Sequence, residues 1–105
     1  MDAAAALVQA RLKRAFSTAG WLSADLHVHS ACSTDSRVPM RDRVFEFVAD
    51  GIDFIVATDH NVVCDYAPLI AEAGVGALLA SATGDELTTA GWGHFGAFPL
   101  PQNPD

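Results

Sequence analysis

The stretch Asp25-Leu26-His27-Val28-His29 contains two histidines that alternate with apolar residues. Side chains alternate between the two faces of a β-strand. A strand here therefore places His27 and His29 on one face together with Asp25, and Leu26 and Val28 on the other. Two imidazoles about 6.6–6.8 Å apart along one strand face can converge on a metal ion. A half-buried strand with two solvated histidines gives the same pattern, so the stretch alone leaves both interpretations open.

Size and charge limit the fold and its partners. The chain has 105 residues, 50% of them hydrophobic, and a formal net charge of −7, which suits one small hydrophobic core. The acidic balance argues against a nucleic-acid backbone or an anionic membrane as the main partner, whereas bound cations would still admit a phosphate substrate. No apolar run reaches the roughly 20 residues of a membrane helix, and the start lacks the pattern of a signal peptide. We therefore expect a cytoplasmic protein.

Cys32 and Cys64 are the two cysteines of the chain. Two thiols in a chain without a secretion signal are expected to be free rather than bridged. Both follow the histidine-containing segments, so an approach to one another or to a metal stays open as the alternative to small side chains in loops.

The hydrophobic pattern predicts alternating strands and helices after an N-terminal helix. We expect three parts: an N-terminal helix and linker (1–20, with the helix over 2–16), a main domain (21–98) and an irregular tail (99–105). Pro39 suits the first turn of a helix that Gly51 ends, and Asp65 can cap a shorter helix that runs to about Ala73. The expected strands span residues 21–28, 53–58, 76–83 and 93–98.

This spacing of strands and helices predicts an α/β fold with βαβ units and a parallel sheet. Folds of this class place their chemistry at the carboxyl ends of the strands. The polar segments of the chain occupy those positions. His27 and His29 end the first strand, Asp59 and His60 follow the second, and Glu86 follows the third.

Taken singly, these positions have ordinary structural explanations. Asp59 suits a helix cap or an Asx-turn, Gly84-Asp85-Glu86 suits a solvated loop, and His94 among glycines suits a hydrogen-bonded core histidine. Taken together, all four histidines of the chain and the carboxylates of Asp35 and Glu86 stand at or near strand ends. This mixture of nitrogen and oxygen ligands suits divalent Zn, Mn or Fe, and Glu86 can bridge two ions.

Four motifs follow one another along the chain. They are Asp-Leu-His-Val-His-Ser at 25–30 with Asp35 after it, Ala-Thr-Asp-His-Asn at 57–61, Gly-Asp-Glu at 84–86 and Gly-His-Phe-Gly-Ala-Phe at 93–98. In this order they resemble the polymerase and histidinol phosphatase (PHP) superfamily of metal-dependent hydrolases. The last two look most like the carbaryl-hydrolase-type branch. The resemblance covers residues 21–98 and implies the first part of a distorted (β/α)7 barrel with a two- or three-metal site.

The resemblance also implies a role for each polar residue. The implied ligands are His27 and His29 for one ion, Glu86 as the bridge to a second, His94 for that second ion, and Asp35 and His60 for a third. Asp59 would orient the neighbouring imidazoles. Glu86, Asp59 and His60 would then be the residues closest to catalysis.

The activity that the resemblance implies is hydrolysis of a small-molecule substrate. A hydroxide that bridges two metals would attack a phosphorus or carbonyl centre. Phosphoesters are the commonest substrates of the family, and carbamate or carboxyl esters come next. Ser30, Arg37 and Asn61 are candidate substrate contacts. Two alternatives stay open: a metal-binding module without catalysis, and a purely structural α/β module.

The chain departs from the family pattern on its C-terminal side. Family members supply a later His or Cys and a late Asp-x-His pair, and this sequence contains neither. Three or four parallel strands also cannot close a barrel, and they leave an unprotected sheet edge. We therefore expect a fragment, an abbreviated gene product, or a half-site that a second copy or a partner chain completes.

Overall fold

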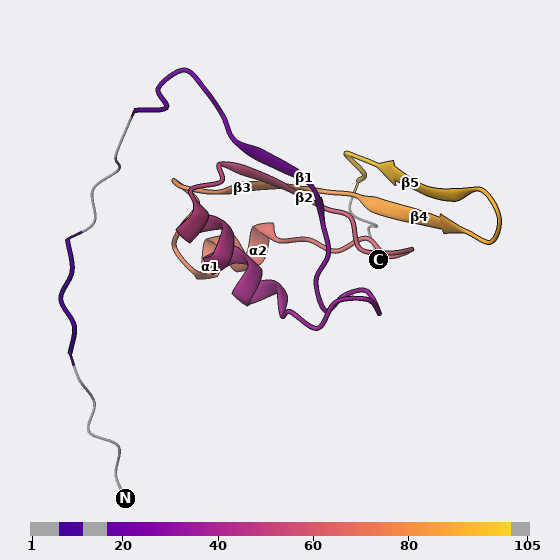
Figure 1. Cartoon of the computed structure of the whole chain (residues 1–105), viewed down its shortest axis with the longest axis horizontal. Helices are drawn as coiled ribbons and strands as arrows, with labels where there is room; N and C mark the ends of the chain where they lie inside the picture. The colour runs from indigo at the N-terminus through magenta and orange to yellow at the C-terminus, as the bar shows by residue number, and fades with distance from the viewer. Residues whose placement is uncertain (1–6, 12–16, 102–105) are drawn as a thin grey trace, which may run out of the picture.

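The described residues form two short sheets and two helices (Figure 1). The computed structural model describes residues 7–11 and 17–101. Both helices lie on the same side of the larger sheet. In chain order the elements are β1 (Ala24–Val28), α1 (Met40–Asp50), β2 (Phe54–Ala57), α2 (Ala67–Glu72), β3 (Ala80–Thr83), β4 (Asp85–Thr89) and β5 (Gly93–Ala97).

The larger sheet is parallel, with β2 between the outer strands β1 and β3. Ile55, Val56 and Ala57 of β2 are fully buried. An unbroken apolar run of this kind is what a central parallel strand needs, because both of its faces are covered. The parallel βαβ arrangement predicted for this part of the chain is therefore confirmed.

Local sequence sets the bounds of α1 as predicted. Pro39 precedes the first turn with φ −56°, an angle that its ring imposes. Gly51 ends the helix in the left-handed conformation with φ 74°, which glycine adopts at least cost. Val44 is fully buried on the face toward the sheet, and Phe47 and Val48 pack beside it. This stripe fixes α1 against the strands.

The hydrophobic core lies between the helices and the sheet. Its buried members are Val28, Val44, Ile55, Ala57, Tyr66, Ile70 and Leu79. Each of the larger side chains stabilises the fold by about 1.5–3 kcal/mol when it leaves water. The core therefore holds the strand ends, from which the candidate site residues project, in fixed relative positions.

The first strand contains a bulge. Asp25 pairs with Ile55 and Val28 pairs with Ala57, so three steps along β1 match two steps along β2. The bulge breaks the strict alternation that grouped Asp25 with His27 and His29. The Asp25 carboxylate accepts a hydrogen bond of 3.0 Å from the backbone N–H of His27 instead.

The last two strands form an antiparallel hairpin, which corrects the prediction of a loop around Glu86. The strand predicted at 93–98 is present as β5, but it pairs with β4 rather than extending the parallel sheet. Glu86 pairs with Gly96, and Thr88 pairs with His94. The sequence of β4, Asp-Glu-Leu-Thr-Thr, lacks the apolar run of a buried strand. This agrees with its place in the hairpin, where most of its residues are partly or fully exposed.

Other parts of the secondary structure also differ from the sequence predictions. The first strand begins at Ala24 rather than at residue 21, and the third begins at Ala80 because residues 76–78 form a turn. Residues 7–11 of the expected N-terminal helix have no regular secondary structure, and the rest of that helix lies outside the described residues. Every helix in the described ranges falls short of the length and hydropathy that crossing a bilayer requires.

Candidate metal centre

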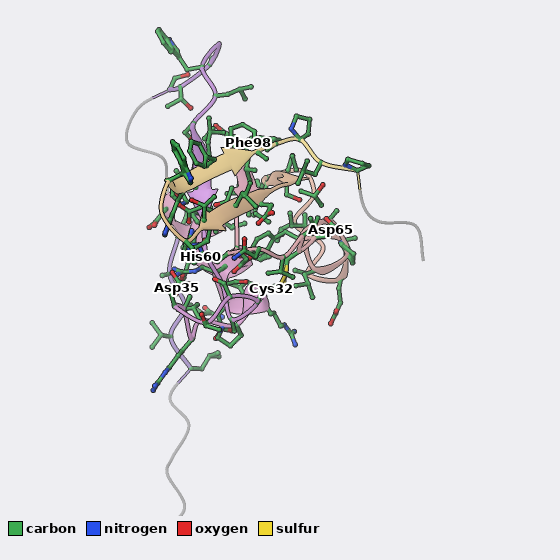
Figure 2. The ribbon with its side chains drawn as sticks, turned by 90° about the vertical axis from the view of Figure 1, so that its right-hand side faces the viewer. Cys32, Asp35, His60, Asp65 and Phe98 are labelled. Carbon is green, nitrogen blue, oxygen red and sulfur yellow. A yellow bond between two sulfur atoms is a disulfide. The ribbon has the colours of Figure 1, made fainter. Side chains whose placement is uncertain are left out.

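The carboxyl ends of β1 and β2 meet the beginning of β4 at one rim of the sheet. The backbone N–H of Thr58 donates to the carbonyl of Val28 at 2.9 Å, which ties the two strand ends together. His60 and Glu86 form a parallel bridge just beyond β2. Asp35 and His60 are both found at this rim when the molecule is viewed from that end (Figure 2).

The carboxylate of Glu86 contacts every histidine of the chain. Its Oε2 atom lies 3.1 Å from Nε2 of His27, 2.9 Å from Nε2 of His29 and 3.2 Å from Nδ1 of His60. Its Oε1 atom lies 3.2 Å from Nδ1 of His94. The Glu86 side chain is only 9% exposed, whereas the imidazole of His27 is 61% exposed. The structure thus gathers five of the predicted site residues into one group, here called the Glu86 cluster.

Three atoms of the Glu86 cluster form a triangle that suits a cation. Nε2 of His27 and Nε2 of His29 lie 2.9 Å apart, and Oε2 of Glu86 lies close to both. A tetrahedral zinc ion with bonds of about 2.0–2.1 Å separates its ligand atoms by about 3.3 Å. The observed separations are slightly shorter than this and also suit hydrogen bonds. His27, His29 and Glu86 thus form a group that can hold a metal ion.

Two further groups of potential ligands adjoin this triangle. Nδ1 of His29 and Nε2 of His60 lie 2.8 and 3.6 Å from Oδ2 of Asp35. His60, Glu86 and His94 also have ligand atoms within 4.8 Å of one another. The described residues therefore include three adjoining groups that can hold a metal ion, and they share His29, His60 and Glu86.

His60 lies beside Asp35, as the resemblance implied, and it has further neighbours. The structure places it beside Glu86 and His94 as well. Its Nδ1 atom lies 2.7 Å from Oγ1 of Thr88, which fixes the orientation of the ring. Sequence reasoning missed Thr88. The available signal was its place two residues after Glu86, on the same face of a strand.

Asp59 is fully buried and holds the loop that follows β1. Its Oδ1 atom accepts hydrogen bonds from the backbone N–H groups of Ser30 and Ser33, at 2.7 and 3.2 Å. The resemblance implied that Asp59 orients the imidazoles. In the described part of the chain the hydrogen bonds of its carboxylate go to this serine loop instead. Its backbone carbonyl accepts a hydrogen bond of 3.3 Å from the N–H of Glu86. Ser30, one of the candidate substrate contacts, is fully buried in the same network.

Two carboxyl groups of the site have shifted pKa values. Burial by itself raises the pKa of Glu86, but the hydrogen bond from His27 and the charges of the other imidazoles outweigh it and leave the pKa below its ordinary value. The hydroxyl of Ser33 donates to Asp35 at 2.6 Å. This bond lowers the pKa of Asp35 to about 2, with burial opposing the shift and His29 adding to it. Both groups are therefore carboxylates at neutral pH, as metal ligands need to be.

A hollow of about 370 Å³ opens beside the Glu86 cluster. Its volume falls within the range of small-molecule sites. Asn61 lines it with a left-handed backbone (φ 53°), and its Oδ1 atom accepts a hydrogen bond from the N–H of Thr88. The lining residues are Cys32, Ser33, Thr34, His60, Asn61, Val62, Thr88 and His94. Arg37, the third candidate substrate contact, is exposed outside this lining.

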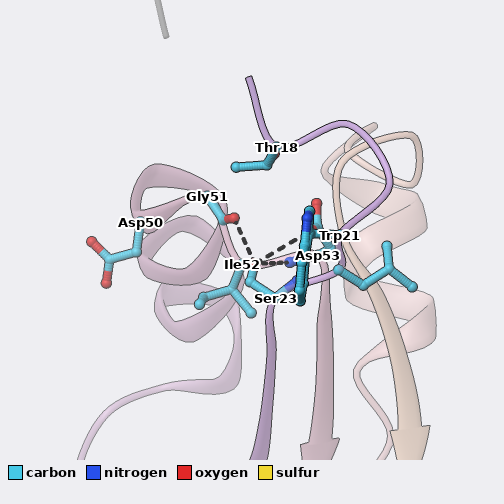
Figure 3. A pocket seen from close by; sticks show the side chains of 8 residues that line it. Thr18, Trp21, Ser23, Asp50, Gly51, Ile52 and Asp53 are labelled. Atoms are coloured by element: carbon cyan, nitrogen blue, oxygen red, sulfur yellow. Dashed lines mark hydrogen bonds between the residues drawn. The ribbon is translucent and has the colours of Figure 1, made fainter. Parts of the chain in front are cut away.

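A second hollow of about 350 Å³ lies at the opposite, amino-terminal end of the strands (Figure 3). Trp21, Asp50 and Asp53 are among its lining residues. The carboxylate of Asp53 accepts hydrogen bonds from the backbone and hydroxyl of Ser23, so it ties the start of β1 to the start of β2. The described lining residues of this hollow include neither imidazole nor thiol, and the first hollow is therefore the candidate functional site.

Cys32 and Cys64 form a disulfide, which corrects the expectation of free thiols. The bond links the loop after β1 to the loop after β2, beside the first hollow (Figure 2). The two positions are 32 residues apart in sequence. They meet because β1 and β2 are neighbouring parallel strands, whose following loops emerge at the same rim.

No protein-family model matches the chain, and neither a curated protein nor a solved structure matches it. The side chains gathered around Glu86 and their order in the sequence are therefore the main indications of function.

Proposed function

We propose that this chain is a metal-dependent hydrolase of the PHP type. Its substrates would be small-molecule phosphoesters, with carbamate or carboxyl esters as the next class. The observation that carries the proposal is the contact of one buried carboxylate, Glu86, with all four imidazoles of the chain. The order of the four motifs supports the same activity.

A divalent cation supplies Lewis acidity and lowers the pKa of a coordinated water toward neutrality. The residues of the chain hold and orient such cations. Glu86 would offer one oxygen to the His27 side of the cluster and the other to the His94 side. The mixed nitrogen and oxygen donors favour Zn, Mn or Fe.

The protein's own residues also shape the substrate site. The Oδ1 atom of Asn61 is engaged by Thr88, which leaves its NH₂ group to donate to a substrate oxygen. Among the described lining residues of the hollow there is neither Lys nor Arg, while Asp35 and Glu86 bring negative charge to the site. An anionic phosphoester is therefore repelled until cations are bound, whereas an uncharged ester is not.

Metal content and hydrolysis together test the proposal. Protein purified without added metal is measured by elemental analysis, then assayed with an aryl phosphate and an aryl ester. We expect bound Zn, Mn or Fe, hydrolysis that a chelator stops, and loss of both properties in Glu86→Gln. Glu72→Gln, which changes an exposed residue of α2, is the matched control and should behave as the parent. Metal bound in stoichiometric amount without cleavage of either compound would instead show a metal-binding module without catalysis.

The open side of the cluster has room for a further chain. The imidazoles of His27 and His94 are 61% and 47% exposed. A second copy or a partner chain could supply further ligands there. In that case the activity per mole of protein rises with protein concentration, and light scattering detects a dimer or larger assembly in the active sample. Activity proportional to concentration in a monomeric sample would show that the chain acts alone.

A further inference from the structure

Cys32, Asp59 and Cys64 form a group of potential ligands that contains no imidazole. Their ligand atoms all lie within 4.8 Å of one another. We propose that, once the disulfide is reduced, these three side chains bind a thiophilic divalent cation, with Zn²⁺ as the preferred ion. This site is separate from the Glu86 cluster and does not depend on the hydrolytic role.

The two oxygens of the Asp59 carboxylate differ in their number of donors. Oδ1 accepts hydrogen bonds from two backbone N–H groups. Oδ2 has only the hydroxyl of Ser30, at 3.1 Å, and the same hydroxyl lies 3.1 Å from Oδ1. Because Oδ1 already has two N–H donors, the single proton of this hydroxyl is available to Oδ2. A carboxylate oxygen with one donor keeps a lone pair that can bind a cation.

The surrounding atoms favour a soft or borderline ion. Sγ of Cys32 lies 3.4 Å from the thioether sulfur of Met40, so sulfur predominates on this side of the site. Thiolate and thioether ligands select Zn and Cu(I), and a carboxylate oxygen favours Zn of the two. The Glu86 cluster, with imidazole and carboxylate donors, offers no sulfur.

The loops need only a small movement to admit an ion. The Cα atoms of Cys32 and Cys64 lie 6.7 Å apart, at the wide end of the range of about 4.4–6.8 Å for disulfides. A zinc ion with Zn–S bonds of about 2.3 Å holds two thiolates about 3.8 Å apart. Rotation of the two side chains and a slight parting of the loops would provide that separation.

The disulfide form and the metal-bound form exclude one another. A thiol reductant donates two electrons and becomes a disulfide, the bond between Cys32 and Cys64 breaks, and each sulfur takes up one proton. Binding of one divalent cation then releases both thiol protons. Reoxidation by a small-molecule disulfide returns the electrons to that disulfide, re-forms the protein bond and expels the cation.

Cobalt(II) tests the proposal, because a thiolate ligand gives a near-ultraviolet charge-transfer band that imidazole and carboxylate ligands do not. The full chain is reduced with a phosphine, freed of reductant under anaerobic conditions and titrated with Co²⁺, beside an oxidised sample. We expect the band in the reduced sample alone, its loss on addition of Zn²⁺, and at least tenfold weaker Co²⁺ binding at this site in Cys64→Ser. The double variant His27→Ala/His29→Ala keeps the band, which separates this site from the proposed hydrolytic centre.

Two results would overturn the proposal: a folded, reduced chain without the charge-transfer band, or an equally intense band in the oxidised chain. Circular dichroism reports whether the reduced chain keeps its fold. If reduction unfolds the chain, addition of Zn²⁺ restores the spectrum when the site forms, and failure to restore it counts against the site.

Discussion

Glu86 presents its negative charge to four imidazoles, and Glu86→Gln removes that charge while keeping the size of the side chain. We expect the affinity for Mn²⁺ or Zn²⁺ to fall at least about 100-fold, since residues that merely orient metal ligands already cost about 10–100-fold. Isothermal titration calorimetry measures the change. Glu72→Gln should bind as tightly as the parent. Equal affinity in Glu86→Gln and the parent would contradict a metal centre at this position.

Tyr66 places a hydroxyl in the hydrophobic core, where the Ser30 hydroxyl is near it but no hydrogen bond of ordinary geometry forms among the described residues. An unsatisfied polar group of this kind is costly, so Tyr66→Phe should raise the free energy of unfolding by about 1 kcal/mol. Urea denaturation followed by circular dichroism measures the difference. A variant less stable than the parent would mean that the hydroxyl has a favourable partner.

The same residue gives the protein a dependence on alkaline pH. Burial raises the pKa of Tyr66 to about 12. The Ser30 hydroxyl and the charge of Arg43 oppose the shift, and the charges of Asp59 and Glu46 add to it. In the unfolded chain tyrosine ionises near pH 10. Between about pH 10 and 12 the unfolded state therefore loses its proton first, and stability falls as the pH rises. Below pH 10 both states stay protonated and the effect is absent.

Unfolding at pH 8 and pH 11 checks this dependence. Tyr66 is the only tyrosine of the chain, so ultraviolet difference absorbance reports its ionisation without interference from another tyrosine. Tyr66→Phe should lose less stability than the parent between the two pH values. An equal loss in both proteins would assign the alkaline sensitivity to other groups.

At the scale of elements, Gly84 joins β3 to β4 where the backbone of two other strands comes close. A Cβ atom at this position would lie 2.8 Å from the carbonyl oxygen of Ala57 and 3.0 Å from that of Ala97. Gly84→Ala should therefore destabilise the protein by about 1–3 kcal/mol and move the strand that carries Glu86, weakening metal binding. Gly76→Ala is the control, because nothing lies within 4 Å of a Cβ there. Thermal unfolding of both variants gives the comparison, and equal melting temperatures would contradict the close packing.

The elements that sequence predicted well have local signals. Helix α1 is bounded by Pro39 and Gly51, whose backbone preferences act without help from distant residues. Strand β2 has an apolar run that suits burial on both faces. Strand β4 has no such signal: its polar residues become a strand because β5 pairs with it and His60 bridges to it. Those contacts join distant parts of the chain, which a local pattern does not contain.

Parts of the candidate site were likewise predictable from the sequence, and parts were not. The grouping of His27, His29 and His60 was predictable because they stand at or just beyond the ends of β1 and β2, where a parallel sheet gathers side chains. Glu86 and His94 reach the same place from the antiparallel hairpin, which was not predicted. The role of Asp59 and the bond between Cys32 and Cys64 were not predictable. Both depend on how the loop after β1 folds over the end of β2, and loop conformation has no simple periodic signature.

For the molecule as a whole, metal binding should couple to stability. The candidate ligands come from β1, from beyond β2, and from the hairpin, so an ion bound by them would join parts of the chain that only folding brings together. An ion at 100 times its dissociation constant adds about 2.7 kcal/mol to the free energy of unfolding. We expect a chelator to lower the melting temperature of the parent and to leave that of His27→Ala/His29→Ala unchanged. A parent indifferent to chelator would show that the ligand groups are not loaded.

The outer position of β1 has a consequence for how copies of this protein behave toward one another. No described strand pairs with its free side, and Leu26 on it is 47% exposed, so the strand offers a template on which another chain could extend the sheet. The net charge of −7 opposes such encounters, but the reach of that repulsion shrinks from about 30 Å in dilute buffer to about 3 Å in molar salt. Charge repulsion thus opposes edge-to-edge pairing of β1 between copies, and we expect high salt to promote such association.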